Sequence, residues 1–506
     1  MKNLLALFTI LNLTVFSVYG QKNVLYFEVQ QAKKSSTNFE NNVLKKANAD
    51  TSALKNFINP DEVFFFDNNP VDVKRSESKN INLVMPLKTG NMVLELIEVP
   101  ESFYNYEVMT SDGKKLPANR DIKHYRGVVK DVENSLAAVT FYKNEMIGLV
   151  STDEGNFNIV KDNKSGKHIF YNERNFKKKH NIDCETVDDT LLSYDPAILS
   201  KQRDILSEKT AVTQTRVINK EVRLHVETEY DVFQTLGSIS AVEVFITGLF
   251  NQVAVLFQNE QILTRVSGMY IWTSDDPYTA VTFTSLLLQF RSTRAHIIGD
   301  LGMLLTFRSN NNGNKGGSAV FDGLCKPFTD SRLAVAMLEP NYNIVSNFSL
   351  SVYIVTHELG HLIGSRHTND CVWNGNNTAI DGCATVVGCP NPGLPPRHGG
   401  TIMSYCHNLP FTVGINFNLG FGPQPGNVIR DRVNNATCLM PPCSNPINFT
   451  NQTVTQGIIV KHCGTVNAQN VNVQNGGSLT LEGSTVNITG DFNVQPGALL
   501  NIKAGP

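Results

Sequence analysis

The sequence lacks an excess of charge of either sign. Lysine and arginine total 44 residues and aspartate and glutamate total 46, so the balance gives no indication of a nucleic acid or an anionic membrane as partner. After its first twenty residues the chain also lacks the run of ~20 apolar residues that a bilayer-spanning helix needs, and we therefore expect no transmembrane segment. Its 506 residues are enough for about three domains.

The first twenty residues have the character of a targeting segment. The basic residue Lys2 is followed by an apolar run and then by small residues suited to cleavage, as in a secretory signal peptide. A membrane anchor is the alternative, but the run is shorter than a bilayer requires. The nine cysteines fit export, because disulfides persist in oxidising compartments. We expect a secreted, extracellular protein.

The most specific pattern in the chain is His357-Glu358-Leu-Gly-His361-Leu-Ile-Gly364-Ser-Arg-His367. On a helix, His357 and His361 project from one face and can share a metal ion. Gly364 can end the helix in the left-handed region, so that the chain turns and brings His367 back as a third ligand. Three histidines leave one position of a tetrahedral zinc ion open, which is typical of a catalytic site.

The open position predicts hydrolysis. A water molecule held there has its pKa lowered from about 16 to about 7. Glu358 can take a proton from this zinc-bound water as it attacks a carbonyl and pass it to the leaving amine. The pattern predicts peptide-bond cleavage with one Zn²⁺ ion; calcium is compatible with the sequence but not derivable from it. The alternative is an ordinary histidine pair on the surface or in the core, and it is disfavoured because five specified residues stand at fixed offsets.

The first part of the chain is predicted to be mainly β. Residues 21 to about 75 show no clear period and are expected to be loosely structured, whereas short alternating runs follow from residue 80 to about 160. A polar, basic connector without periodicity extends from about 172 to 216. Cys184 lies alone in it. Its thiolate can fill the open zinc position and keep the enzyme latent until the connector is cut; a disulfide with a distant cysteine and an idle thiol are the alternatives.

From Arg216 strands and helices alternate up to the zinc motif, which predicts an α/β domain with a mixed sheet. The segment 310–317, rich in asparagine and glycine, is expected to be a flexible loop. The edge strand predicted after it could pair with an extended substrate, although a plain surface loop before a strand would look the same. This strand comprises Ser318, Ala319, Val320 and Phe321.

The segment 371–406 is rich in Gly, Pro, Asn and Cys, which predicts an irregular lower wall of the cleft held by disulfides. Within it, Met403 follows a glycine turn and Tyr405 stands two residues further on. On chemistry alone Met403 is a core residue, whereas Tyr405 is a candidate catalytic residue for which a turn tyrosine packed in the core is an equally expected alternative. An odd number of cysteines leaves one unpaired. The disulfide candidates are Cys325, Cys371, Cys383, Cys389, Cys406 and Cys438 around the zinc motif, and Cys443 and Cys463 beyond it.

The final part of the chain repeats. Residues 473–481 align with residues 494–502 at a period of 21 residues, which predicts stacked β coils of solenoid type. Attachment to a surface, sorting during secretion and spacing are the alternative roles. The predicted division is a signal peptide at 1–20, a β-rich prodomain at 21–200 with a connector to about 215, a catalytic domain at 216–440 and a small β-repeat domain at 441–506.

Together with the turn at Met403, the segment from His357 to His367 resembles the metzincin clan of zinc endopeptidases. The cysteine-rich segment after His367 and the segment 317–325 are most similar to the reprolysin (adamalysin, M12B) family. The resemblance implies a catalytic domain with a mixed five-stranded sheet and a zinc helix, a disulfide between Cys325 and Cys438, a hydrophobic floor at Met403 beneath the zinc, and substrate binding by residues 318–321.

The resemblance extends to the first part of the chain. His124-Tyr-Arg-Gly127, followed by Ser135-Leu-Ala-Ala-Val, is similar to reprolysin propeptides, which carry a latency cysteine; Cys184 is placed suitably for it, although Glu185 replaces the usual glycine. Tyr405 falls where astacins and serralysins have a tyrosine that ligates zinc or stabilises the oxyanion. Thr368 stands where reprolysins usually have aspartate.

These patterns predict a secreted zinc metalloendopeptidase, made as a latent precursor and acting on proteins or peptides, with attachment to the cell surface through its C-terminal region as one role of the repeats. They do not predict an oligomeric state. The alternative is a zinc-holding extracellular adhesion module with incidental or no hydrolysis. Glu358 favours the enzyme, because a binding module has no need of a general base.

Overall fold

The computed structural model describes most of the chain. The described ranges are 24–35, 39–49, 52–56, 58–67, 79–162, 165–177, 182–186, 193–201, 220–340, 348–386, 388–390, 392–409, 413–442, 446–462, 464–483 and 485–504. The predicted signal peptide, 1–20, lies outside these ranges. Much of the predicted connector, including residues 202–219, lies outside them as well.

The N-terminal part forms a nine-stranded sheet with the order β1-β3-β4-β7-β8-β9-β10-β11-β2. Neighbours are antiparallel except for the parallel pair β1 and β3. Residues 21–75, expected to be loosely structured, instead contain helix α1 (Val24–Lys34) and two of the strands, because their few apolar side chains are buried against the sheet. The strands are β1 (Glu40–Val43), β2 (Val63–Phe66), β3 (Asn80–Pro86), β4 (Asn91–Glu98), β7 (Lys123–Val129), β8 (Leu136–Tyr142), β9 (Glu145–Thr152), β10 (Gly155–Lys161) and β11 (His168–Asn172).

A second, eight-stranded sheet has the order β12-β16-β17-β15-β13-β14-β5-β6. Its pairs are parallel except for β16 with β17 and β5 with β6. The sheet is mixed, as predicted, but larger than five strands. Both edges of the catalytic strands are covered by strands from the N-terminal part, which satisfies backbone groups that would otherwise be exposed. The strands are β5 (Glu107–Thr110), β6 (Lys115–Pro117), β12 (Ile182–Cys184), β13 (Glu221–Thr228), β14 (Leu263–Ile271), β15 (Leu301–Thr306), β16 (Lys315–Ala319) and β17 (Leu333–Met337).

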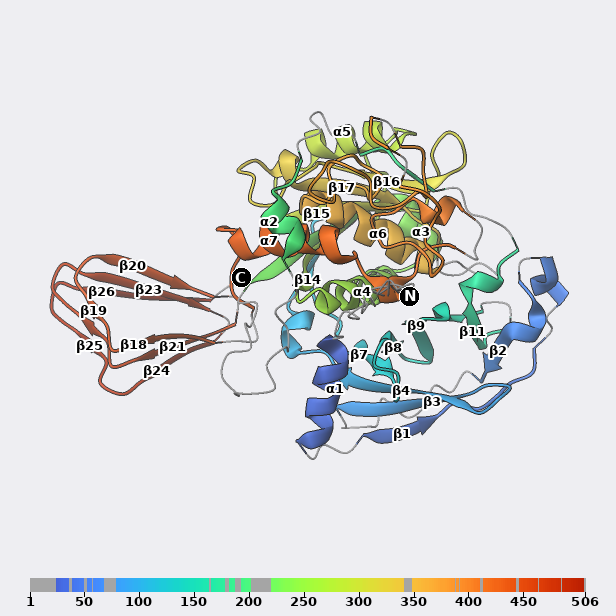
Figure 1. Cartoon of the computed structure of the whole chain (residues 1–506). Coiled ribbons are helices and arrows are strands. Elements are labelled where there is room, and N and C mark those ends of the chain that lie inside the picture. The colour runs from blue at the N-terminus through green and yellow to red at the C-terminus, as the bar shows by residue number, and fades with distance from the viewer. Residues whose placement is uncertain are drawn as a thin grey trace, which may run out of the picture.

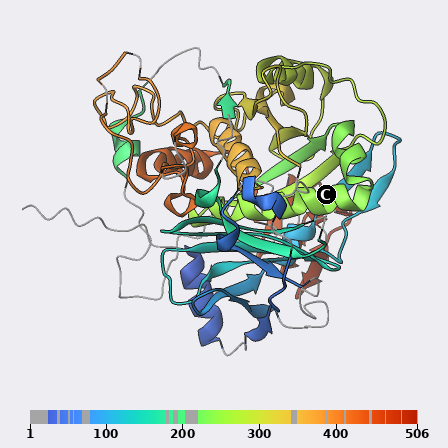
Figure 2. The same cartoon turned by 90° about the vertical axis from the view of Figure 1, so that its right-hand side faces the viewer.

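Helix α4 (Ile239–Asn259) lies between the two sheets (Figures 1 and 2). Helix α4 is apolar on nearly all sides because one of its faces packs against the nine-stranded sheet and another against the eight-stranded sheet. Among the described helices it alone is long and apolar enough to cross a membrane, by length and composition only, so the chain does contain one apolar run of a length that we did not expect after the N-terminus. Most of that segment is buried inside the protein, as in the core helix of a globular fold.

Polar contacts join α4 to the N-terminal sheet. Arg126 of β7 donates from Nε to Asn251 Oδ1 at 2.9 Å and from a terminal nitrogen to Gln258 Oε1 at 2.9 Å. Gly127 is required beside it, because a Cβ there would lie 1.9 Å from the carbonyl oxygen of Glu95. The segment from His124 to Gly127, on which the propeptide resemblance depends, therefore holds the sheet against α4.

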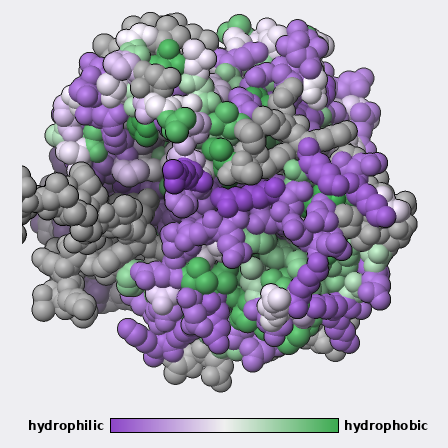
Figure 3. All heavy atoms as spheres, turned by 45° about the vertical axis from the view of Figure 1, so that its right-hand side comes forward, coloured by the Kyte–Doolittle hydropathy of each residue, from purple (hydrophilic) through white to green (hydrophobic). Residues whose placement is uncertain are grey.

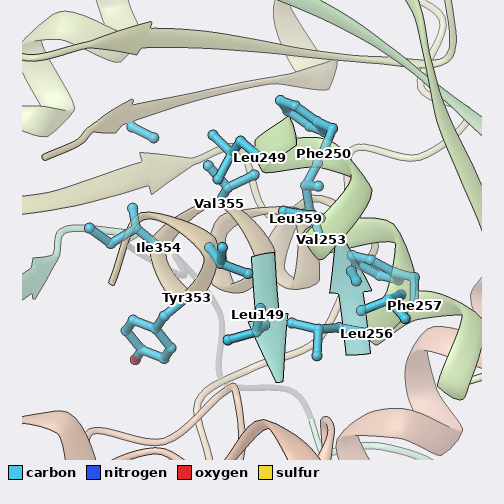
Figure 4. Close-up of a cluster of buried hydrophobic side chains, with 14 of the residues drawn as sticks. Leu149, Leu249, Phe250, Val253, Leu256, Phe257, Tyr353, Ile354, Val355 and Leu359 are labelled. Carbon is cyan, nitrogen blue, oxygen red and sulfur yellow. The ribbon is translucent and has the colours of Figure 1, made fainter. Parts of the chain in front are cut away.

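Helix α6 (Phe348–Leu362) packs beside α4 in the same hydrophobic core. Leu149 of β9, Leu249 and Val253 of α4, and Val355 and Leu359 of α6 are buried in one cluster (Figure 4). The position of α6 is thus fixed from the N-terminal sheet as well as from the catalytic strands. The remaining α-helices are α2 (Pro196–Ser200), α3 (Tyr230–Leu236), α5 (Phe283–Thr293) and α7 (Pro423–Asn435).

Residues 446–504 form three parallel three-stranded sheets that project from the body (Figure 1). The register pairs Val473 with Val494 and Leu481 with Ile502, which is the alignment read from the sequence. Side-chain amides also stack from coil to coil, as in the bond from Asn467 to Asn448 at 2.9 Å. The sheets are β18 (Ile447–Thr450), β21 (Thr465–Gln469) and β24 (Thr485–Thr489); β19 (Thr453–Val454), β22 (Asn472–Val473) and β25 (Asn493–Val494); and β20 (Gly457–Lys461), β23 (Ser478–Gly483) and β26 (Leu499–Ala504).

Hydrophilic side chains dominate the face of the molecule drawn in Figure 3, and hydrophobic residues gather there only in small groups. The large apolar residues are mostly inside: Trp373, Phe250, Phe257 and Phe283 are fully buried. Such a surface is typical of an ordinary globular protein.

Candidate active site

The histidine motif lies on the last turns of α6 and in the loop that follows. Gly364 adopts φ +106°, which ends the helix, and a Cβ at this position would lie 2.7 Å from Asp322 Oδ1. The backbone N–H of Gly364 donates to the carbonyl of His361 at 2.9 Å. The turn predicted at Gly364 therefore exists, and it returns the chain so that His367 faces the helix.

The Nε2 atoms of the three histidines converge. His361 Nε2 lies 3.2 Å from His357 Nε2 and 3.0 Å from His367 Nε2. All three side chains are buried, with exposures of 2 %, 1 % and 8 % for His357, His361 and His367. Four residues offer a metal-ligating atom within 4.8 Å of one another: these histidines and Cys184.

Backbone carbonyls fix the tautomer of two of these rings. His357 Nδ1 lies 2.8 Å from the carbonyl of Ile402, and His361 Nδ1 lies 2.8 Å from that of Ser365. Because a carbonyl only accepts, each Nδ1 carries the proton and each Nε2 presents a lone pair. Burial lowers the pKa of His357 to about 4 and that of His361 well below its usual value. The lone pairs of neutral imidazole nitrogens that face one another repel unless a cation lies between them. This set of histidine donors fits Zn²⁺.

The third histidine is held by its own loop. Its backbone N–H donates to Asp370 Oδ2 at 3.2 Å, and its carbonyl accepts from Trp373 Nε1 at 2.7 Å. Thr368, where the sequence departs from the reprolysin pattern, is buried, and its backbone N–H donates to the carbonyl of Met403 at 3.0 Å. Thr368 therefore ties the loop that carries His367 to the turn at Met403.

Met403 lies beneath the motif. Its side chain is fully buried, and a Cβ on Gly360 would lie 2.5 Å from Met403 Sδ. Gly360, between His357 and His361 in the helix, is therefore the position at which the methionine approaches the backbone of α6. The structure thus has a hydrophobic floor where the resemblance implied one.

Glu358 lies beside the histidines and is buried, with 1 % of its surface exposed. Burial raises the pKa of Glu358 to about 8, and hydrogen bonds from Cys184 and Thr186 act in the opposite direction. Thr186 Oγ1 donates to Glu358 Oε2 at 3.1 Å. A carboxyl group with a raised pKa, next to a metal-binding cluster, is suited to accept and return a proton near neutral pH.

The edge strand lies earlier than predicted. Strand β16 covers Lys315–Ala319, so Ser318 and Ala319 belong to it but Val320 and Phe321 do not, and residues 315–317 are not a flexible loop. Glycine disfavours strands in general. Here Gly316 and Gly317 are needed because a Cβ would lie 1.8 Å from the carbonyl oxygen of Asp183 and 2.6 Å from Glu358 Cγ, respectively. The close approach of Asp183 and Glu358 to β16 therefore explains why this strand contains two glycines.

The free edge of β16 is occupied by residues 182–186, which we call the cleft segment. Strand β12 pairs with β16 in parallel, with Ile182 opposite Lys315 and Cys184 opposite Gly317. The backbone N–H of Glu185 donates to the carbonyl of Gly317 at 3.1 Å, and Thr186 Oγ1 accepts from the N–H of Ala319 at 2.9 Å. The chain's own connector therefore takes the place expected for an extended substrate.

Cys184 reaches the histidine cluster from the cleft segment. Its Sγ lies 3.5 Å from His361 Nε2, and it is the free cysteine among the described residues. Burial and the nearby carboxylate of Glu358 raise the pKa of the Cys184 thiol well above its usual value when no cation is present. A metal ion in the cluster would reverse this, since thiolate is the form that binds metals.

Side chains from the lower wall contact the cleft segment on its other side. Tyr405 OH donates to the carbonyl of Cys184 at 3.4 Å, and its ring lies 4.7 Å from that of His367. His407 Nε2 lies 3.4 Å from the carbonyl of Ile182, and His407 Nδ1 lies 2.8 Å from Tyr353 OH. Tyr405 was a predicted site residue. Thr186, His407 and Tyr353 were missed. Thr186 had a signal in the sequence, because it stands two residues from Cys184, the spacing that puts side chains on one side of an extended chain.

Three disulfides hold the surroundings of the site in the described residues. Cys325 is bonded to Cys438, the pairing that the resemblance implied. The other two bonds lie in the lower wall and join Cys371 to Cys389 and Cys383 to Cys406. The candidates Cys443 and Cys463 lie outside the described residues. A second metal-like group, Asp381 with Cys383 and Cys406, is not a ligand set, because its two cysteines form a disulfide.

Comparison with known families agrees with this geometry. Residues 219–414 match the family model Reprolysin_5, described as metallo-peptidase family M12. This segment is therefore similar to metallo-peptidases of family M12. The M12 match includes the histidine motif, Glu358, β16 and Met403, and it begins after the cleft segment.

Other comparisons reach less far. No curated protein matches the chain. Among solved structures, the metalloproteinase-II from Bacteroides fragilis is similar at 12 % sequence identity and a TM-score of 0.36, over 61 % of this chain and 89 % of that one. The similarity to family M12 therefore depends on the match of residues 219–414 together with the histidine cluster.

Proposed function

We propose that the protein is a zinc-dependent endopeptidase of the metzincin type, secreted as a latent precursor. The observation that carries the proposal is the convergence of three buried histidines beside a buried glutamate, with His361 Nε2 3.2 Å from His357 Nε2 and 3.0 Å from His367 Nε2. His357, His361 and His367 would hold the ion. When bound, zinc would act as a Lewis acid that polarises the scissile carbonyl and lowers the pKa of a water molecule.

The chain's own residues perform the proton transfer. Glu358 accepts a proton from the attacking water and then donates it to the amine of the leaving peptide. Strand β16 holds the substrate by its backbone groups, as it holds the cleft segment. Tyr405, on the opposite wall, supplies a hydroxyl group to the peptide backbone near the reacting bond.

Latency follows from the cleft segment. Cys184 places its sulfur beside the histidine cluster, Thr186 donates to Glu358, and β12 covers the substrate strand. Metal, base and substrate site are thus blocked by five consecutive residues. Cutting the connector and releasing this segment would free all three, so we propose that the N-terminal part up to about residue 200 acts as a prodomain.

Two further proposals concern location. The sequence of residues 1–20 and the disulfides of the lower wall support export, because such bonds persist outside a reducing cytosol. The coils of residues 446–504 project from the catalytic part and share no part of the site (Figure 1). We propose that they serve attachment, with the catalytic reaction independent of them.

Activity and metal content measured together test the proposed function. The connector is cut by limited proteolysis, and the protein is assayed on denatured protein substrates with zinc, after removal of zinc by a chelator, and after zinc is restored. We expect about one zinc per chain, cleavage only in the zinc-loaded form, and recovery on restoration. Metal binding without any hydrolysis would support the adhesion module instead.

A further inference from the structure

A short part of the predicted connector, residues 193–201, is docked on the catalytic part of the chain. It contains Tyr194 and helix α2, which lies beside α7 (Figure 1). Leu199 of α2 is buried, and its carbonyl accepts from Asn427 Nδ2 of α7 at 2.9 Å. We call residues 193–201 the brace segment, because the contacts below hold a turn of the metal site in place.

The hydroxyl group of Tyr194 contacts the turn that follows α6. It donates to the carbonyl of Gly364 at 2.6 Å and accepts from the backbone N–H of Arg366 at 3.1 Å. These two bonds hold the peptide groups on both sides of Ser365. Since Gly364 ends the helix with φ +106°, the chain beyond it is no longer supported by the regular bonds of α6. The hydroxyl of Tyr194 supplies support at this point.

The turn held by Tyr194 carries the supports of two candidate zinc ligands. The carbonyl of Ser365 lies 2.8 Å from His361 Nδ1 and so fixes the tautomer of that ring. His367 directly follows Arg366, and its Nε2 lies 3.0 Å from His361 Nε2. A rotation of the turn would therefore move the hydrogen-bond partner of His361 and the ring of His367 together.

The ring of Tyr194 reaches the same loop by a second route. Its centroid lies 4.9 Å from that of Trp373, which is fully buried. Trp373 Nε1 donates to the carbonyl of His367 at 2.7 Å. Leu199 belongs to the same apolar cluster as Trp373. Tyr194 thus acts on the loop before His367 through its hydroxyl group and after His367 through the indole ring.

The ring and the hydroxyl group of Tyr194 have separate roles. Packing against Trp373 needs only the ring, so a phenylalanine at this position would satisfy it. The hydroxyl group is needed only for the peptide groups of the turn. Partners that orient metal-binding histidines from outside typically contribute about 10- to 100-fold to metal affinity.

Given the zinc site of the proposed function, we propose that Tyr194 is a positioning residue of that site, and that the brace segment is a functional part of the catalytic domain although the sequence places it in the connector. Tyr194 acts through the turn from Gly364 to His367 and contributes no ligating atom. The inhibitory part of the chain then ends with the cleft segment. An enzyme that has lost the brace segment would bind zinc more weakly.

Zinc affinity tests the role of Tyr194 without any hydrolysis. The full, uncut chain is prepared with Cys184→Ala, so that the histidines bind the ion without the sulfur, and zinc binding is measured by competition with a chelator. Adding Tyr194→Phe should weaken zinc binding by about 10- to 100-fold. The control Tyr142→Phe loses a hydroxyl that lies 2.8 Å from Ser240 Oγ, and should leave the affinity unchanged. Equal affinities in the two variants would overturn the proposal.

Unfolding of the metal-free chains separates positioning from general stability. Each variant loses one hydroxyl group, so Tyr194→Phe and Tyr142→Phe should shift the denaturant midpoint by similar small amounts. Only Tyr194→Phe should lose zinc affinity. If the loss of zinc affinity instead followed the loss of stability in both variants, Tyr194 would have a merely structural role and the proposal would be wrong.

A second experiment follows the brace segment through activation. The unsubstituted full chain is cut in its connector, separated by size exclusion, and the zinc-loaded active fraction is analysed by mass spectrometry. We expect residues 193–201 in that fraction, joined or bound to the catalytic domain. An active fraction of unchanged zinc affinity without this segment would contradict the proposal. If no fraction cleaves a substrate, the proposed function has failed, while the zinc affinities still decide the role of Tyr194.

Discussion

Gly317 of β16 lies against Glu358 of α6, so closely that a Cβ on the glycine would lie 2.6 Å from Glu358 Cγ and 2.6 Å from the carbonyl oxygen of Val335. The residue that makes the edge strand atypical in sequence is thus the one that leaves room for the Glu358 carboxyl group. The proposed substrate strand and the proposed base are packed against each other at this contact.

Replacing this glycine should therefore affect catalysis. Gly317→Ala should displace the Glu358 side chain and lower kcat of the activated enzyme by about 10²-fold, because misplacement by about 1 Å has that order of effect. Overpacking should also cost about 1–3 kcal/mol of unfolding free energy. Gly457→Ala is the matched control, since nothing lies within 4 Å of a Cβ there. Equal kcat in both variants would show that the contact does not position Glu358.

The cleft segment predicts a graded loss of latency. Cys184→Ala should make the uncut chain partly active, because the sulfur no longer blocks the metal site and only the pairing with β16 and the contacts of Thr186 still hold the cleft segment in place. Thr186→Val should give weaker activation, since it removes only the bonds to Glu358 and to the N–H of Ala319. The measurement is peptide cleavage by protein whose intact mass shows that the connector is uncut. Latency of the Cys184→Ala chain equal to that of the unsubstituted chain would refute a role for the sulfur.

A buried carboxyl group at the junction of the N-terminal part and α6 predicts a pH dependence of stability. Glu173 lies in the 3₁₀ helix Glu173–Asn175 and accepts from Asn156 Nδ2 and from Ser349 Oγ of α6. Burial raises the pKa of Glu173 to about 7 from 4.5, although Arg174 acts in the opposite direction. Its stabilising effect is thus fully present below pH 4.5 and is lost as the pH rises through about 7.

The substitution Glu173→Gln should remove this dependence. Between pH 5.5 and 8 we expect the unsubstituted full chain to lose about 1–2 kcal/mol more unfolding free energy than the variant, as the raised pKa implies. Denaturant unfolding at several pH values measures the difference. The exposed neighbour Glu154→Gln is the control. Parallel pH profiles for the unsubstituted chain and Glu173→Gln would mean that Glu173 is not held neutral by the junction.

The disulfide between Cys325 and Cys438 spans a separation of 113 residues and joins the segment after β16 to the end of the catalytic region. Replacing both cysteines by serine should lower the unfolding free energy by about 4–5 kcal/mol in the loop-entropy description. Replacing Cys371 and Cys389, separated by 18 residues, should cost less, about 3 kcal/mol. Denaturant unfolding under non-reducing conditions compares them. The reverse order would indicate that local contacts outweigh chain entropy.

Parts of this site could be read from the sequence because they are local. The spacing of His357 and His361 and the glycine turn at Gly364 depend on helix geometry alone. The lower wall and the repeat register also followed from residues close in sequence. The extent of β16 could not be predicted, because glycine disfavours strands and its reason lies in Asp183 and Glu358, far away in the chain.

The features of the fold and the site that could not be predicted depend on pairing between residues far apart in the chain. Nothing in residues 107–117 indicates that they pair with β14 and extend the catalytic sheet, since strand partners depend on tertiary contacts. Thr186 and His407 are ordinary residues in sequence and become part of the site only when the cleft segment lies between β16 and the lower wall. The strands β3 to β10 of the nine-stranded sheet, by contrast, were expected as a β-rich region because their alternation is local, whereas β1 and β2 were not.

The central claim is that Glu358 serves as the base of a zinc peptidase whose metal is held by the three histidines. Glu358→Gln, with the exposed control Glu154→Gln, is prepared as the full chain, cut in the connector and measured for zinc content and for kcat on a denatured protein. We predict about one zinc per chain in both variants and a kcat for Glu358→Gln lower by about 10²–10⁴-fold. Cleavage by zinc-loaded Glu358→Gln at the rate of the control would contradict the account.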